Sequence, residues 1–109
     1  MTSERCFPGM ISLNNRDVLD ELYAVIDDRF NNPKPGSYVT SLIADKKGID
    51  RVLEKIGEES TEFIIAVKNG NHERTREEAA DLFFHLLVAM RAAGITLDDL
   101  IEELEKRRK

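Results

Sequence analysis

The chain has 109 residues, of which 41% are hydrophobic and 34% are charged, and its formal net charge is -5 at pH 7. This length predicts a single domain with one hydrophobic core. The acidic balance argues against a general affinity for nucleic acid or for an anionic membrane, because both partners need a basic surface.

The sequence also favours a reducing, aqueous environment. Cys6 is the one cysteine and cannot form an internal disulfide, and no window approaches the length of a membrane span. We therefore expect a cytoplasmic protein with no membrane partner. Residues 1–13 are expected to be an N-terminal arm without an assigned function, and residues 14–109 to form the domain.

Helical periodicity dominates this domain from its start. The first predicted helix spans residues 15–30, with Asn14 or Asn15 as its cap. It ends at the segment 31–36, NNPKPG, where prolines and a glycine forbid continuation. Residues 37–44, SYVTSLIA, are rich in β-formers but have no partner strand, so we expect a loop that can include helical turns.

Two long helices are predicted next. One covers residues 45–69 and stops before Gly70, and the other covers residues 73–93 and stops before Gly94. A short connection joins them, so they should pack antiparallel. The second is apolar almost all round and should be the most buried element.

A last helix follows Thr96, with Asp99 at its third position in a variant of the capping box. The sum is an all-α helical bundle of about four helices. The apolar circumference of residues 73–93 exceeds what three amphipathic neighbours cover, so we expect a homo-oligomer, at least a dimer, to complete the bundle.

The stretch KIGEESTE, residues 55–62, crowds Glu58, Glu59 and Glu62 together, although like charges at this spacing repel. At about 100° per residue, with Glu58 at zero, Glu59 and Glu62 point to about 100° and about 40°. Both directions lie beside the apolar stripe of the helix, which consists of Ile49, Val52, Leu53, Ile56, Phe63 and Val67. A solvated acidic face would lie opposite that stripe. This placement predicts a positive partner next to the core.

The helix at residues 73–93 repeats the pattern with Glu78 and Asp81, again three apart. Asp81 interrupts an apolar run, and a buried carboxylate persists only with a partner or a metal. Antiparallel packing can bring this pair to face Glu59 and Glu62. Four carboxylates would then line one cleft.

The chemistry of these ligands favours one class of cofactor and substrate. Oxygen ligands without a matched imidazole or thiolate suit Mg²⁺, or Mn²⁺, better than zinc or copper. Mg²⁺ keeps waters and substrate phosphates among its ligands, so the expected substrate is a polyphosphate. A metal-activated water would attack phosphorus, and the metal charge would stabilise the developing charge.

The spacing Glu58-Glu59-x-x-Glu62, fifteen residues, then Glu78-x-x-Asp81 resembles the signature of the all-α nucleoside triphosphate pyrophosphatase superfamily, which includes MazG proteins and dimeric dUTPases. The segments GSYVTSLIA, DKKGIDRVLEKIGEESTEFIIAVKNGN and EEAADLFFHLLVAM more specifically resemble the phosphoribosyl-ATP pyrophosphatase family. The resemblance implies Mg²⁺-dependent hydrolysis of phosphoribosyl-ATP to phosphoribosyl-AMP and pyrophosphate. This reaction is the second step of histidine biosynthesis, and the family works as a cytoplasmic homodimer or larger assembly.

Residue roles follow from the same resemblance. It implies that the metal ligands are Glu59, Glu62, Glu78 and Asp81. Glu58 is then a further ligand or a base for the attacking water.

Five other residues are candidates for binding the substrate. Lys47 and Lys55 lie beside the acidic motif, where they can hold phosphates or simply be surface lysines. The hydroxyls of Ser37, Tyr38 and Thr40 belong to the segment that looks like the family's substrate loop. Contact with phosphate or ribose and a capping role are both open for them.

His85 lies one turn beyond Asp81 on the same side of its helix. We expect it to form hydrogen bonds within the core rather than to assist proton transfer.

Two rival functions remain open at the level of sequence. The same metal site on a different base pocket would give a MazG-like pyrophosphatase that acts on another nucleoside triphosphate. A non-catalytic helical interaction module would use the acids only to solvate a surface.

Overall fold

The computed structural model describes residues 15–108, and this part of the chain contains five helices and no strand. Their bounds are α2 Asn15–Asn31, α3 Tyr38–Ile43, α4 Ile49–Lys68, α5 His72–Ala92 and α6 Leu97–Lys106. The predicted all-α class is confirmed. The predicted arm at residues 1–13 and the candidate cap Asn14 lie outside the described residues, so the proposed domain limits remain a prediction.

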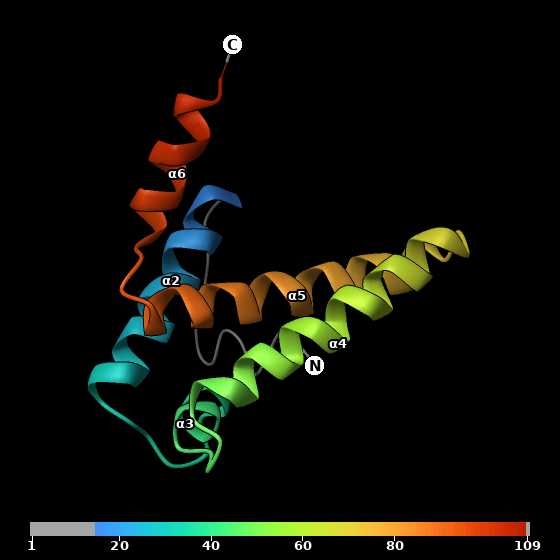
Figure 1. Cartoon of the computed structure of the whole chain (residues 1–109). Helices are drawn as coiled ribbons and strands as arrows, with labels where there is room; N and C mark the ends of the chain where they lie inside the picture. The colour runs from blue at the N-terminus through green and yellow to red at the C-terminus, as the bar shows by residue number, and fades with distance from the viewer. Residues whose placement is uncertain (1–14, 109) are drawn as a thin grey trace.

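The two longest helices, α4 and α5, form an antiparallel hairpin and lie side by side (Figure 1). The turn between them is short because Asn69 caps the C-terminal end of α4 and Gly70 adopts the left-handed backbone, with φ +68°. Asn71 then caps α5, since its side chain accepts a hydrogen bond from the Arg74 amide. The predicted antiparallel packing is confirmed.

The segment predicted as a loop after NNPKPG contains a helix, α3. The Ser37 hydroxyl caps it by accepting a hydrogen bond from the Thr40 amide at 3.3 Å. Val39 and Leu42, three residues apart, are both buried. Burial of this face overrides the strand preference of the individual residues, so the helical turns are confirmed as a defined helix, and only the loop predicted around them was wrong.

The start of α4 also differs from the prediction. Residues 45–48 form a turn instead of a first helical turn: the Gly48 amide donates to the Asp45 carbonyl at 2.9 Å, and the Lys47 amide donates to the Asp45 side chain at 2.9 Å. Gly48 has φ +60°, which is incompatible with the helix. The helix therefore begins at Ile49, four residues after the predicted start.

The core lies at one end of the α4–α5 hairpin, where α2 and α3 pack against it and α6 begins. Its buried residues are Leu22, Ile26, Val39, Leu42, Val52, Phe84, Leu87, Val88 and Leu97. The opposite end of the hairpin projects away from this core (Figure 1).

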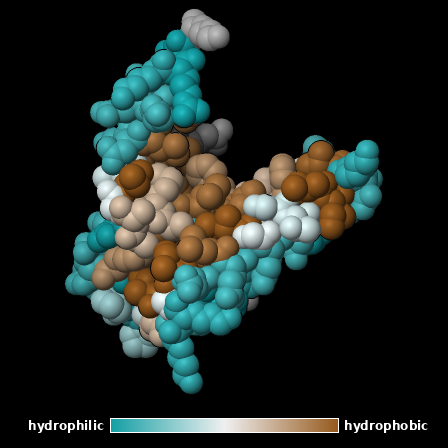
Figure 2. All heavy atoms as spheres, viewed as in Figure 1, coloured by the Kyte–Doolittle hydropathy of each residue, from teal (hydrophilic) through white to brown (hydrophobic). Residues whose placement is uncertain are grey.

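Part of the predicted apolar stripe of α4 is exposed. Ile49 and Leu53, which the sequence assigned to the buried face, are 44% and 49% exposed, and Val67 near the projecting end is 51% exposed. Figure 2 shows hydrophobic surface on the hairpin, including its projecting end. The prediction treated the whole helix as covered, whereas α2 and α3 reach only one part of it.

The last helix, α6, has the predicted capping box: the Thr96 side chain accepts from the Asp99 amide, and the Asp99 side chain accepts from the Thr96 amide. It leaves α5 at a bend of 106°. In the described part of the chain, no single helix is long and apolar enough to span a membrane; α5 and α6 meet that test only when taken together across this bend.

Candidate active site

Four carboxylates occupy the hairpin just beyond the core. Burial raises the pKa of Glu59 on α4 to about 7, and the negative charge of Asp81 on α5 adds to this effect. Burial also raises the pKa of Glu78 on α5, with a further contribution from the neighbouring carboxylate of Glu62 on α4. Each acid of one helix therefore interacts with an acid of the other.

Glu59 is 9% exposed, and its carboxylate lies beside a buried histidine. Its Oε1 is 2.6 Å from His85 Nδ1, but that nitrogen is also 2.8 Å from the main-chain oxygen of Asp81. Nδ1 has room for one proton, and when it donates to the Asp81 carbonyl, Glu59 Oε1 is buried without a hydrogen bond. This orphaned oxygen is a site where a cation would stabilise the structure.

His85 is 1% exposed and is held at both ring nitrogens. Its Nε2 lies 2.8 Å from the hydroxyl of Tyr38, in addition to the contact of Nδ1 with the Asp81 main chain. Burial lowers the pKa of the imidazole, so the ring is neutral at pH 7. The predicted role of His85 in hydrogen bonds of the core is confirmed.

Glu78 is 3% exposed and has the second orphaned oxygen of the site. Arg74, one turn earlier on α5, donates from Nη2 to Glu78 Oε1 at 2.5 Å. Oε2 of the same carboxylate is buried without a hydrogen-bond partner. The guanidinium lowers the pKa of Glu78 but does not offset burial and the charge of Glu62.

The other predicted residues on α4 and in the turn before it lie nearer to solvent. Glu58 is exposed, and its carboxylate is 3.9 Å from the ammonium of Lys55, whose charge also lowers the pKa of Glu59. Lys55 is thus part of the site's electrostatics. Lys47 instead donates to both carboxylate oxygens of Glu54 at 3.0 Å, so its ammonium is already engaged in the described structure.

The predicted hydroxyl residues lie around a different hollow. Ser37, Tyr38 and Thr40 line a pocket of about 600 Å³ between α2 and α3. Ser37 caps α3, and Thr40 Oγ1 accepts from the Lys34 amide at 3.0 Å, so both have the structural roles left open by the sequence. Tyr38 connects this pocket to the carboxylates through its contact with His85.

A sequence profile of the phosphoribosyl-ATP pyrophosphohydrolase family matches residues 19–108, which is most of the chain. The chain belongs to this family. The resemblance found in the sequence is therefore confirmed.

Relatives named phosphoribosyl-ATP pyrophosphatase match over most of both chains. That of Methanoregula boonei is 63% identical over 92 residues, which cover 84% of this chain and 88% of the relative. That of Methanocella arvoryzae is 61% identical over 93 residues, with 85% and 98% covered. A bacterial relative from Clostridium botulinum is 45% identical over 97 residues, with 89% and 86% covered.

In this pyrophosphohydrolase, the chemistry of the acids fits a hard divalent cation. All four side chains offer carboxylate oxygens, and two of those oxygens are buried without a hydrogen bond. As positioned, however, the acids pair rather than converge: no three His, Cys, Asp or Glu side chains of the described residues are arranged to hold one ion. A bound cation would draw the pairs together and would offset the burial and the like charges that raise the pKa values of Glu59 and Glu78.

Sequence reasoning missed three cations of this pyrophosphohydrolase. Arg74 precedes Glu78 by four residues on one helix, and this spacing places the two side chains together. The pair could therefore have been predicted from the sequence. Arg29 and Lys34 line the pocket at Ser37 but lie outside the acidic motif on which the sequence reasoning concentrated. The proline-rich turn that holds Lys34 gave no indication of which side chains it would bring together.

Proposed function

We propose that the chain binds Mg²⁺ among Glu59, Glu62, Glu78 and Asp81 and uses it to hydrolyse phosphoribosyl-ATP to phosphoribosyl-AMP and pyrophosphate. The activity itself follows from the family: the chain is a phosphoribosyl-ATP pyrophosphohydrolase, an enzyme of histidine biosynthesis. The observation that supports the metal assignment is the pair of buried, orphaned carboxylate oxygens, one on each helix of the hairpin.

Four acids can lie close together before the metal and the substrate bind because two of them have raised pKa values. Burial raises the pKa of Glu59 to about 7 and also raises the pKa of Glu78, which favours their neutral forms, so they can lie close to Asp81 and Glu62 without the full repulsion of four charges. Mg²⁺, when bound, supplies the charge that orients the triphosphate and activates water for attack. Mn²⁺ has the same ligand preference and is the alternative metal.

The neighbouring residues support this chemistry from the edge of the site. Glu58 is exposed on the same turn of α4, where it is a further ligand or the base that accepts a proton from the attacking water. The positive charge of Lys55 acts on both neighbouring acids, because it pairs with Glu58 and lowers the pKa of Glu59. We assign it to electrostatic stabilisation of the phosphates.

We also propose that the enzyme is a cytoplasmic homo-oligomer. The hairpin exposes Ile64, Ile65 and Val67 by 64%, 53% and 51%, which is costly for an isolated chain in water. A second copy that packs its own hairpin against this face would cover these side chains.

The decisive experiment identifies the products from phosphoribosyl-ATP with Mg²⁺ and with a chelator. We expect phosphoribosyl-AMP and pyrophosphate only with the metal. Glu62→Gln and Asp81→Asn should abolish this turnover while circular dichroism shows an unchanged helical fold, and Glu103→Gln on α6 is the matched control that should retain it. A clear preference for a free nucleoside triphosphate would overturn the substrate, and full activity of both amide variants would overturn the metal site.

A further inference from the structure

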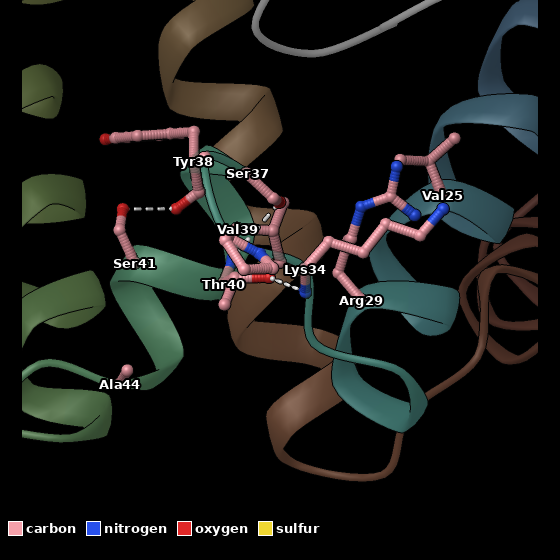
Figure 3. Close-up of a pocket in the computed structure, with 11 residues that line it drawn as sticks. Val25, Arg29, Lys34, Ser37, Tyr38, Val39, Thr40, Ser41 and Ala44 are labelled. Atoms are coloured by element: carbon pink, nitrogen blue, oxygen red, sulfur yellow. Dashed lines mark hydrogen bonds between the residues drawn. The ribbon is translucent and has the colours of Figure 1, made fainter.

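A pocket of about 600 Å³ lies between the C-terminal end of α2, the connection after it, and α3 (Figure 3). We call it the Arg29 pocket, because Arg29 and Lys34 line it together with the hydroxyl-bearing Ser37 and Thr40. No Asp or Glu is among the described residues that line it. In a chain of net charge -5, a pocket with two cations and no acid in its lining favours an anionic ligand.

Arg29 has binding capacity that the protein itself does not use. Its side chain is 13% exposed, and its Nη1 donates to the Asp28 carboxylate at 2.6 Å. Its Nε is buried without a hydrogen-bond partner. An unpaired donor on a buried guanidinium is unfavourable, and a phosphate oxygen is the acceptor that best matches its geometry.

The other polar groups of the Arg29 pocket are also arranged as donors. The Lys34 side chain extends along the same side as that of Arg29 (Figure 3), and no carboxylate of the described residues forms an ion pair with it. Ser37 Oγ and Thr40 Oγ1 each accept a hydrogen bond from a main-chain amide. Each hydroxyl therefore keeps its proton for a ligand oxygen.

The Arg29 pocket is connected to the four carboxylates through one side chain. Tyr38 lines the pocket, and its ring points away from Arg29 and Lys34 (Figure 3). Its hydroxyl is 2.8 Å from His85 Nε2, and Nδ1 of the same ring is 2.6 Å from Glu59. Two side chains in contact, those of Tyr38 and His85, thus separate the pocket from Glu59 of the carboxylate cluster.

We propose that the Arg29 pocket binds the 5′-phosphate of the substrate's phosphoribosyl group. This inference rests on the proposed function, in which the triphosphate lies at the carboxylates. Phosphoribosyl-ATP has an anionic group at each end, whereas a free nucleoside triphosphate has only one. A second anion site at the Arg29 pocket therefore selects the phosphoribosyl compound over ordinary nucleotides.

The test compares phosphoribosyl-ATP with ribosyl-ATP, the same compound without the 5′-phosphate, in the wild-type chain and in Lys34→Gln. The wild type should prefer the phosphorylated compound by about 10- to 100-fold in kcat/KM, the range expected for charge-assisted hydrogen bonds. Lys34→Gln should raise KM for phosphoribosyl-ATP by about 10-fold with little change in kcat, and should leave ribosyl-ATP unaffected. Lys68→Gln, an exposed lysine on α4, is the matched control and should behave as the wild type.

Because Arg29 is mostly buried, its removal would disturb folding. The test therefore uses two separate variants, Arg29→Lys, which keeps the positive charge, and Lys34→Gln. Equal losses on both compounds, or no preference in the wild type, would overturn the pocket as a phosphate site. The proposal would also be overturned if the variants changed the inhibition by free inorganic phosphate but kept the wild-type preference for phosphoribosyl-ATP over ribosyl-ATP. The pocket would then bind an effector and not the substrate.

Failure of the proposed function can be distinguished from failure of the Arg29 pocket as a phosphate site. It would appear as absence of phosphoribosyl-ATP turnover in the wild type. Calorimetric titration with ribose 5-phosphate would still test the Arg29 pocket, because Lys34→Gln should weaken that binding about 10-fold and plain ribose should not bind. Equal binding of ribose 5-phosphate by the wild type and by Lys34→Gln would overturn the inference.

Discussion

The Tyr38 hydroxyl and the His85 imidazole are 2.8 Å apart, although 47 positions separate the two residues in the chain. This contact joins the short helix α3 to the buried face of α5. It also fixes the ring that lies beside Glu59. One hydrogen bond therefore links the Arg29 pocket, the core and the carboxylate cluster.

Tyr38→Phe should test this link. The variant keeps the ring that stacks on Phe84 with centroids 5.8 Å apart, but loses the contact with His85. We expect the free energy of unfolding to fall by about 1 kcal/mol, and activity to fall because the histidine loses one of its two fixed contacts. Urea unfolding and steady-state kinetics measure the two effects.

The matched control is Tyr23→Phe, which loses a hydrogen bond of 2.7 Å to the Ile95 carbonyl away from the carboxylates. It should show a similar change in stability with unchanged kcat. If both variants reduce activity equally, the contact between Tyr38 and His85 has no special role in the site.

The pKa of Glu59 predicts how stability depends on pH without metal. The carboxyl has an ordinary pKa of 4.5 and a pKa of about 7 in the folded chain, so between these values the folded state binds more protons than the unfolded state. The contribution to stability is complete below pH 4.5 and is lost as the pH rises through 7. Thermal unfolding in a chelator should show this loss, and Mg²⁺ should restore stability most at the higher pH.

Glu59→Gln isolates this effect, because His85 titrates in the opposite sense. Burial lowers the pKa of His85, so its contribution is lost as the pH falls below its ordinary value of 6.5. The amide variant keeps the contribution of His85 and removes that of Glu59. A variant with the same pH slope as the wild type would contradict the prediction.

The sequence predicted the hairpin and the presence of acids on both of its helices, because both depend on local patterns, but the acids of the described residues lie in pairs and do not converge as predicted. Three-residue spacing places Glu59 and Glu62 on one face whatever the rest of the chain does. In contrast, α3 forms because Val39 and Leu42 are buried against other helices, and Tyr38 meets His85 only through that packing. Such contacts between distant segments depend on the tertiary arrangement, which periodicity alone does not reveal.

Arg74 should stabilise the acidic cluster when no metal is present. Its guanidinium pairs with the buried Glu78, whereas ordinary exposed pairs on a helix contribute little. We expect Arg74→Gln to lower the free energy of unfolding by about 1–2 kcal/mol in a chelator, and Mg²⁺ to recover part of the loss. Arg76→Gln, an exposed arginine on the same helix, should have almost no effect, and equal losses in both variants would contradict the assignment.

Two glycines, one just before α4 and one inside it, should respond in opposite ways to substitution by alanine. Gly48 has φ +60°, so Gly48→Ala should cost about 1–2 kcal/mol from backbone strain. Gly57 lies inside α4 with nothing near the position of a Cβ, so Gly57→Ala should stabilise the chain by about 0.5–1 kcal/mol. Urea unfolding measures both free energies of unfolding, and changes of the same sign would contradict the prediction.

Replacement of one exposed residue should test the proposed oligomer. Ile64 is 64% exposed at the projecting part of the hairpin, where a second copy would bury it. Ile64→Lys would place a charge in that interface and should convert the assembly to monomers in sedimentation velocity. His72→Lys adds the same charge at the same end of the hairpin without removing apolar surface, so it should leave the assembly intact. A wild-type chain that sediments as a monomer at micromolar concentration would refute the proposal, because the exposed isoleucines would then face water in the active enzyme.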